Sequence, residues 1–292
     1  MRRFSLTLLA LLTLLVIQSC GPAPNPLFYA AHKGGETVYL FGSIHAADES
    51  FYPLPEKIET AFESSQALAV EVDIRDIDQM KLTKFILTNG MYPQGMTLEQ
   101  ALGEDAEKFK AYCEKEGIPW QQMNPMRPWM AAMFLSQMII QKTGIDPSQG
   151  LDLYFMNKAG DREIISLESM ESQLETFSGV PEEVQILSLL EGIEEEKDPV
   201  KSLKELTRLW KKGERVPLEE NIFESRLEKP ELEPYYKALF DVRNIGMEEG
   251  IEKALAREEI STLFVVVGAG HLLGDQGLVE LMKQKGYEVE RL

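Results

Sequence analysis

Two histidines follow similar sequence patterns near opposite ends of the chain. Residues 39–45 read YLFGSIH and residues 263–271 read LFVVVGAGH, so each apolar run meets a glycine and, three residues later, His45 or His271. The chain has only three histidines. Neutral imidazole binds metal ions and moves protons near neutral pH. The repeated pattern therefore indicates paired histidines in one site, although each could instead be a hydrogen-bonded structural residue.

Acidic residues follow two other predicted strands. Glu71 and Asp73 come after one apolar run, and Glu168 comes after another. If these strands are parallel, their carboxyl ends meet at one edge of the sheet, where open α/β sheets bind ligands. Imidazoles and carboxylates suit a divalent ion such as Mn, Co or Zn, and a remaining carboxylate can act as general base.

The glycine before each histidine has an expected physical role. We expect it to let the chain turn sharply off the strand and bring the backbone close to a ligand. Asp73 and Asp152 could orient the imidazoles from behind. We favour helix capping for both, because Asp152 precedes a helical pattern and Asp73 follows a strand.

The elements that must position these residues alternate along the chain. Short apolar, β-branched runs predict strands, and longer amphipathic patterns predict helices between them. Strands are expected over residues 37–41, 67–72, 163–167, 263–267 and 287–291, and helices over 56–65, 76–87, 98–116, 129–141, 151–159, 170–177, 182–193, 200–211, 218–227 and 234–257. This order predicts an α/β (mixed α+β) fold with a central, largely parallel sheet, flanking helices and a large helical insertion at about 181–257.

Composition limits the partners. The chain has 292 residues, with 30 Lys+Arg against 48 Asp+Glu and a formal charge of -18. That charge repels phosphate backbones, so no nucleic-acid partner is expected.

The N-terminus resembles that of a bacterial lipoprotein. Arg2 and Arg3 precede an apolar stretch that ends in IQSC at Cys20, and the stretch is short for a bilayer span. We expect residues 1–19 to be a signal peptide, Cys20 to be lipidated, 20–27 to form a tether and 28–292 to form one domain. The protein would then be extracytoplasmic and membrane-anchored, at the outer membrane or periplasm of a double-membraned host. The alternative is a plain secretory signal with an incidental cysteine.

Longer motifs resemble the TraB/GumN family, which includes the Tiki proteases. They are YLFGSIHAADESFYPLPEKIETAFESSQALAVEVD, then GLD with YF and ISLESMESQLETFS, and finally RNIGM with VVVGAGHLLGDQGLVELMKQKGYEVERL. The resemblance covers about Phe28 to Leu292. It implies an EreA/ChaN-like fold and a metal-dependent hydrolase, as Tiki members are metal-dependent proteases.

The family's functional positions match His45, Glu71, Glu168, Arg243 and His271. By this resemblance His45 and His271 would be metal ligands, and Glu71 or Glu168 the remaining ligand or general base. Arg243 would stabilise negative charge on a carbonyl oxygen. We expect a peptidase acting on peptide or protein substrates. The alternatives are a lipoprotein that binds a small peptide or haem-like ligand, and a structural protein that keeps only the fold.

Other features are given structural interpretations. His32 is expected at the surface, and Cys113 is expected to be a half-buried thiol rather than a nucleophile. Residues 128–140, PWMAAMFLSQMII, are too short to span a bilayer and are expected to form a core helix, or less simply the adaptable wall of a peptide groove.

Overall fold

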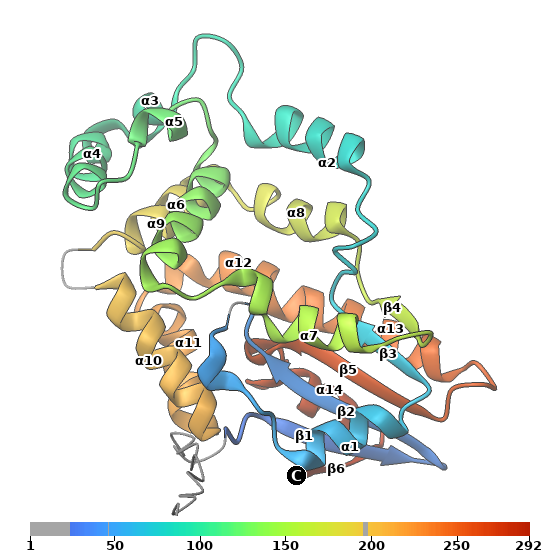
Figure 1. Cartoon of the computed structure of the whole chain (residues 1–292). Helices are drawn as coiled ribbons and strands as arrows, with labels where there is room; N and C mark the ends of the chain where they lie inside the picture. The colour runs from blue at the N-terminus through green and yellow to red at the C-terminus, as the bar shows by residue number, and fades with distance from the viewer. Residues whose placement is uncertain (1–23, 46, 195–197) are drawn as a thin grey trace, which may run out of the picture.

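A six-stranded sheet forms the centre of the protein (Figure 1). The computed structural model describes residues 24–45, 47–194 and 198–292. The strand order is β4-β3-β5-β2-β1-β6, and β2, β5, β3 and β4 run parallel while β1 is antiparallel to both of its neighbours. The strands are β1 (Phe28–Lys33), β2 (Glu36–Ser43), β3 (Ala67–Val70), β4 (Glu163–Ser166), β5 (Thr262–Gly268) and β6 (Glu288–Arg291).

The predicted fold class, a mixed α/β fold with a largely parallel sheet, is confirmed. The prediction missed β1, which pairs with β2 across a turn at Gly34 and Gly35, both with positive φ. His32 lies on this strand and is exposed, as expected for a surface residue.

Helices fill the connections between the parallel strands. Between β3 and β4 lie α2 (Gln79–Phe85), α3 (Leu98–Leu102), α4 (Ala106–Lys115), α5 (Trp120–Met123), α6 (Pro128–Thr143) and α7 (Leu151–Lys158). Between β4 and β5 lie α8 (Met170–Ser178), α9 (Glu182–Glu191), α10 (Pro199–Lys212), α11 (Arg215–Glu228), α12 (Glu233–Tyr236) and α13 (Arg243–Leu255). Two further helices are α1 (Glu56–Ser64), after β2, and α14 (Leu278–Gln284), before β6. The single helix predicted over 234–257 is instead α12, a π-helical turn at Lys237–Val242 and α13.

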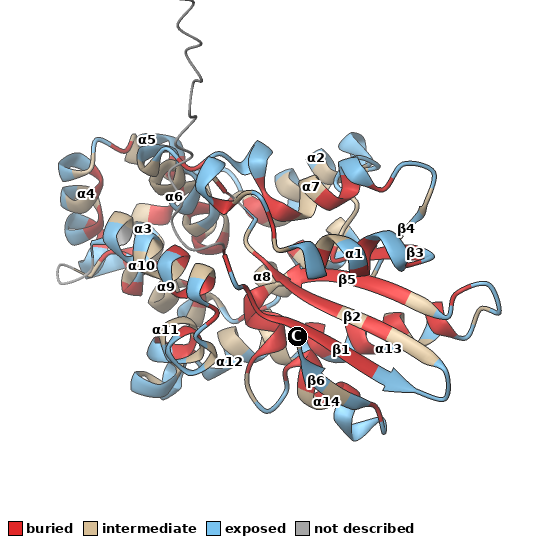
Figure 2. Cartoon of the chain, turned by 60° about the horizontal axis from the view of Figure 1, so that its bottom comes forward, coloured by how far each residue is buried: buried red, intermediate tan, exposed pale blue. Residues whose placement is uncertain are grey.

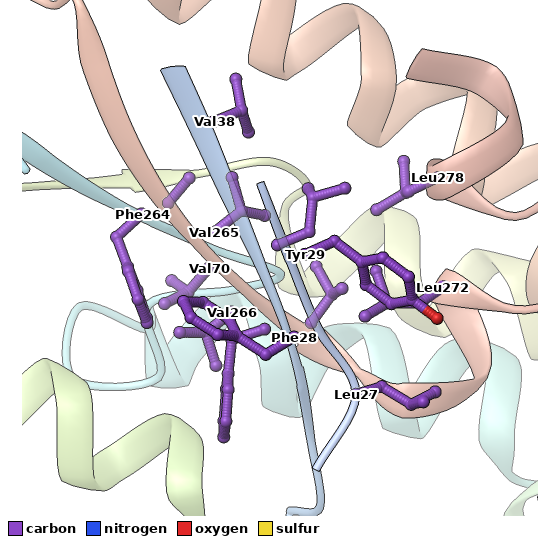
Figure 3. Close-up of a cluster of buried hydrophobic side chains, with 14 of the residues drawn as sticks. Leu27, Phe28, Tyr29, Val38, Val70, Phe264, Val265, Val266, Leu272 and Leu278 are labelled. Atoms are coloured by element: carbon purple, nitrogen blue, oxygen red, sulfur yellow. The ribbon is translucent and has the colours of Figure 1, made fainter. Parts of the chain in front are cut away.

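Both faces of the sheet are covered. Phe62 of α1 and Phe155 of α7 pack against Phe264 of β5 on one face. On the other face, Tyr29 lies near Leu272 and Leu278, whereas Phe28 and Phe264 lie on the opposite side of the strands (Figure 3). The inner strands are therefore mostly buried, with exposed residues at the end of β1 in Figure 2, whereas the residues of the edge strands β4 and β6 are intermediate or exposed.

A second apolar cluster lies away from the sheet. Most of its residues lie in helices α3 to α6 and α9. It includes Cys113 of α4, which is fully buried, and Leu135 of α6. Cys113 is therefore more buried than the half-buried thiol that was expected, and burial raises its pKa to about 11. Helix α6 is a core helix on this side, and its Met133 is partly exposed. None of the helices in the described ranges is long and apolar enough to cross a membrane.

Candidate active site

The predicted site residues converge at one edge of the sheet. His45 follows β2, Glu71 follows β3, Glu168 follows β4 and His271 lies in a 3₁₀ turn, Ala269–Leu272, that follows β5. The register explains this, because Val70 lies opposite both Val266 and Ser166, and Ser43 lies opposite Gly268, so the four parallel strands end at nearly the same level.

Glu71 lies at the centre of the cluster. Its side chain is 6% exposed, and Oε1 accepts a hydrogen bond of 2.6 Å from the backbone N–H of Gly268. The same oxygen lies 3.9 Å from Nε2 of His45 and 3.7 Å from Nε2 of His271. Burial alone would raise the pKa of Glu71, but His271 in the protonated form that it takes at acid pH, His45 and Arg243 together lower it to about 2. The carboxylate is therefore ionised.

Arg243, at the start of α13, joins the two glutamates. Its Nη2 donates to Oε2 of Glu71 at 2.6 Å and also to Glu168, and its Nε donates to Glu168 at 3.0 Å. The remaining nitrogen, Nη1, donates to the carbonyl of Leu239 at 3.3 Å. Burial raises the pKa of Glu168 against the lowering effect of Arg243, and the charge of Glu71 raises it further. Two buried carboxylates thus share one guanidinium, and Glu168 is the one more easily protonated.

The tautomer of His271 is set by Asn244. Nδ2 of Asn244 donates to the carbonyl of Gln276 at 2.8 Å, so its Oδ1 must face the histidine, 2.6 Å from Nδ1 of His271. An amide oxygen only accepts, so Nδ1 carries the proton and Nε2 has a free lone pair. His271 is 4% exposed, and its burial lowers its pKa to about 4. It is therefore neutral near pH 7, with its lone pair directed toward Glu71.

His45 has a matching partner. Its Nδ1 lies 3.1 Å from Oδ2 of Asp152, and Oδ1 of Asp152 accepts a hydrogen bond of 2.9 Å from Ser43. The predicted capping role of Asp152 is wrong: α7 begins after Gly150 with no side-chain cap, and Asp152 orients an imidazole instead. Asp152 also raises the pKa of His45 to about 10. The His45 side chain is 66% exposed, so this histidine is the accessible one of the pair.

Asp73 does not join the cluster. Its carboxylate accepts from the backbone N–H and the guanidinium of Arg75, in the turn after β3. No helix begins there, so the helix-cap prediction is wrong for this residue too, and Asp73 stabilises a turn.

The glycines of the two motifs allow close approach rather than a sharp turn. Gly42 and Gly268 both lie within strands and neither has a positive φ. A Cβ on Gly42 would come within 3.1 Å of Ala269 in the turn that carries His271. A Cβ on Gly268 would come within 3.4 Å of Nε2 of His45 and 3.3 Å of Oε1 of Glu71. The missing side chains keep the space between the histidines and Glu71 open.

The donor atoms suit a divalent cation. Both Nε2 atoms face Oε1 of Glu71. The lone pair of His271 Nε2 and a lone pair of this oxygen point toward each other, and this contact is unfavourable without a cation between the two atoms. Ligand atoms that each lie about 2.1 Å from a tetrahedral ion are about 3.4 Å from each other. This is slightly less than the 3.7 Å and 3.9 Å that separate the two nitrogens from Oε1 of Glu71. Among the residues that the structure describes, no three His, Cys, Asp or Glu side chains lie close enough together to hold a metal ion. Binding would therefore need a small inward shift, which is easiest for the exposed His45.

Several site residues were not predicted as such from the sequence. Asn244 and the Gly268 N–H complete the cluster, and Gln173 of α8 donates to Glu71 at 3.3 Å. Asn244 directly follows Arg243 in the RNIGM motif and Gln173 lies in the ISLESMESQLETFS motif, so the motifs themselves were the available signal. Cys20, the predicted lipidation site, lies outside the described residues.

Comparison with known proteins gives a family match and distant relatives. The model of the TraB/PrgY/gumN family matches residues 27–291. Metalloprotease TIKI1 of Xenopus tropicalis is 23% identical over 86% of this chain and 58% of its own length. An uncharacterized protein of Treponema pallidum (strain Nichols) is 25% identical over 56% of this chain and 49% of its own length. The chain thus spans about half the length of these relatives. No solved structure matches.

Proposed function

Because the family match covers residues 27–291, the chain belongs to the TraB/PrgY/gumN family, and we propose that it is a metal-dependent hydrolase that cleaves peptide bonds. The observation that supports this most is the pair of imidazole Nε2 atoms facing one carboxylate oxygen, with each Nδ1 held by a side-chain oxygen, of Asp152 or Asn244. The distant similarity to a protein named a metalloprotease agrees with it.

The geometry favours a division of roles between the two glutamates. His45 Nε2, His271 Nε2 and Glu71 Oε1 would hold the ion, since both nitrogens lie within 3.9 Å of that oxygen. His45, whose pKa Asp152 raises to about 10, would have to lose its Nε2 proton when the ion binds. A bound divalent ion would polarise the scissile carbonyl group and acidify water. Glu168, whose raised pKa lets it exchange a proton, would act as general base and acid.

Arg243 would position both carboxylates. Its three guanidinium nitrogens are already engaged by Glu71, Glu168 and the Leu239 carbonyl. Its expected role in stabilising charge on a carbonyl oxygen stays a prediction, and it would require the guanidinium to exchange one of these partners for the substrate.

The test is metal content together with turnover. The full chain, purified in detergent without chelator, is analysed for bound metal and assayed on a fluorogenic peptide library with added Mn, Co or Zn. We expect metal-dependent cleavage that is lost in His45→Ala and His271→Ala. His32→Ala is the matched control, because His32 is exposed on β1 and outside the cluster. Bound metal without turnover would favour a binding protein, and no metal after reconstitution would refute the metal site.

We also propose that the protein is a lipoprotein anchored through Cys20 on the extracytoplasmic side of a membrane. The support is the sequence of residues 1–20. Metabolic labelling with a fatty-acid analogue should mark the protein, and Cys20→Ala should abolish the label. Label that persists in the variant would overturn this proposal.

A further inference from the structure

A groove runs from the candidate site along the outer edge of the sheet. It has a volume of about 570 Å³, and Glu168 is part of its wall. Figure 1 shows α2 and α8 next to each other above this edge. The groove lies between these helices and β4, and its lining includes Lys81, Leu82, Ile164, Ser166, Glu168 and Glu171.

The strand that lines this groove has one unpaired edge. Among the strands of the described residues, β4 is terminal in the sheet and pairs only with β3. The N–H of Leu167 donates to Val70 of β3 at 2.9 Å, and strand residues alternate, so the backbone groups of Ile164 and Ser166 point away from β3. Within the described ranges, no backbone group pairs with them. These two residues are also the ones from β4 that line the groove.

The charge of the groove is strongly negative. Its lining contains the carboxylates of Asp73, Asp76, Asp78, Glu168 and Glu171, and Lys81 is the one basic residue that the described part of the chain adds to it. Three of these carboxylates already face cations: Asp73 faces Arg75, Asp78 faces Lys81 and Glu168 faces Arg243. Asp76 and Glu171 have no ion-pair partner among the residues that the structure describes. The groove therefore has unbalanced negative charge beside an open strand edge.

We propose that this groove binds an extended peptide segment as an added strand on β4, with a Lys or Arg side chain directed to Asp76 and Glu171. Strand addition supplies affinity through main-chain hydrogen bonds and selectivity through side-chain pockets. A segment in this position would lie beside Glu168, so one end would reach the candidate catalytic cluster. The inference rests on the proposed function and specifies its substrate as an extended, basic peptide.

The first experiment tests the backbone pairing from the peptide side. A fluorescein-labelled decapeptide containing Lys is compared with two twins, each N-methylated at one of the two alternating sets of residues. One twin should bind about tenfold more weakly in fluorescence polarisation, because its paired N–H groups are gone, while the other twin keeps them. Equal affinity for the peptide and both twins would overturn the proposal.

The second experiment tests the pairing from the protein side. Ile164→Pro removes an N–H that points away from β3, and edge strands tolerate proline. We expect Kd and KM for the Lys peptide to rise about fivefold to tenfold, with kcat changed much less. Ile165→Val is the control, because this neighbouring residue of β4 does not line the groove and keeps its N–H, so its Kd should match that of the unmodified protein. Circular dichroism confirms that both variants are folded.

The third experiment tests the charge. Asp76→Asn with Glu171→Gln should weaken the Lys peptide several-fold and leave a Gln-substituted peptide unchanged. An equal loss for both peptides would contradict the charge assignment.

Binding and cleavage outcomes separate the two proposals. If no peptide is cleaved but Kd keeps these dependences, the groove proposal stands and the hydrolase proposal fails. If peptides are cleaved with a KM indifferent to Ile164→Pro and to N-methylation, the hydrolase proposal stands and the groove proposal fails.

Discussion

Glu71 and Glu168 are expected to contribute differently to stability and to metal binding. Glu71 is ionised, with a pKa of about 2, and is bound by Arg243 and the Gly268 N–H. Replacing it by glutamine leaves Arg243 with one carboxylate in a buried site, so we expect Glu71→Gln to lower the free energy of unfolding by about 3 kcal/mol and to abolish metal binding. Urea unfolding and metal analysis measure these effects.

Glu168→Gln is expected to behave differently. Burial raises the pKa of Glu168, so its charge is costly to keep and its removal should change the free energy of unfolding by only about 1 kcal/mol. Metal content should remain, while kcat should fall about 10²- to 10⁴-fold because a proton-transfer group is lost. If Glu168→Gln also lost the metal, the division of roles between the two glutamates would be wrong.

Asn244 gives a test of imidazole positioning. Asn244→Ala removes the acceptor for Nδ1–H of the buried His271, so that the ring can rotate or change tautomer. We expect metal affinity to fall about 10- to 100-fold, as is typical when such a partner is lost. Isothermal titration with Zn measures it. Gln66→Ala serves as a control outside the site, because the side-chain oxygen of Gln66 accepts bonds from Ser261 and Thr262 at the opposite end of β5. An equal loss there would mean a general effect.

The sequence was sufficient to identify the residue types at the site but not all of their contacts. His45, Glu71, Glu168 and His271 could be found because they follow apolar runs, and strands of similar pattern end at one edge. Asp152 was misinterpreted because an acidic residue beside a helix start fits a cap equally well. The contacts of Arg243 depend on how α13 is rotated about its own axis. A sequence pattern does not determine that rotation relative to strands far away in the sequence.

At the level of elements, the glycine contacts can be tested directly. A Cβ on Gly150, at the start of α7, would overlap the backbone carbonyl of His45. Gly150→Ala should therefore displace His45 and lower kcat/KM at least about tenfold, since small displacements of a site residue have large effects.

Gly246→Ala is the matched control. Gly246 lies on the exposed side of α13, near Arg243, with nothing within 4 Å of an added Cβ. Alanine there should raise the free energy of unfolding by about 0.5–1 kcal/mol through helix propensity and leave kcat/KM unchanged. Similar activity losses in both variants would contradict the role assigned to Gly150.

The elements themselves were largely predictable. Apolar β-branched runs identified five strands, whereas β1, FYAAHK, was missed because its apolar part is short and ends in His and Lys. The break between α12 and α13 was missed because the π-helical turn at Lys237–Val242 keeps the residues helical without a proline or glycine to mark it. That turn matters for the site, because its Phe240 packs against His271, with ring centroids 5.3 Å apart.

At the level of the whole molecule, the two apolar clusters differ in how close they lie to the candidate site. The larger cluster contains residues of the sheet and of the helices that cover it, including the strands after which His45, Glu71 and His271 follow. The smaller cluster, in α3 to α6 and α9, contains none of them. The site should therefore depend more on the packing of the sheet than on that of the helical cluster.

Paired substitutions of one methylene group test this dependence. Ile118→Val in the smaller cluster and Ile58→Val in the larger should each cost about 0.5–1.5 kcal/mol, because both side chains are buried. Native-state hydrogen exchange should then show faster exchange in α4 to α6 for Ile118→Val, with β5 unaffected, if the helical cluster opens by itself. Ile58→Val should instead accelerate exchange in β5. If Ile118→Val accelerated β5 equally, the two clusters would unfold as one cooperative unit, and the site would depend on both.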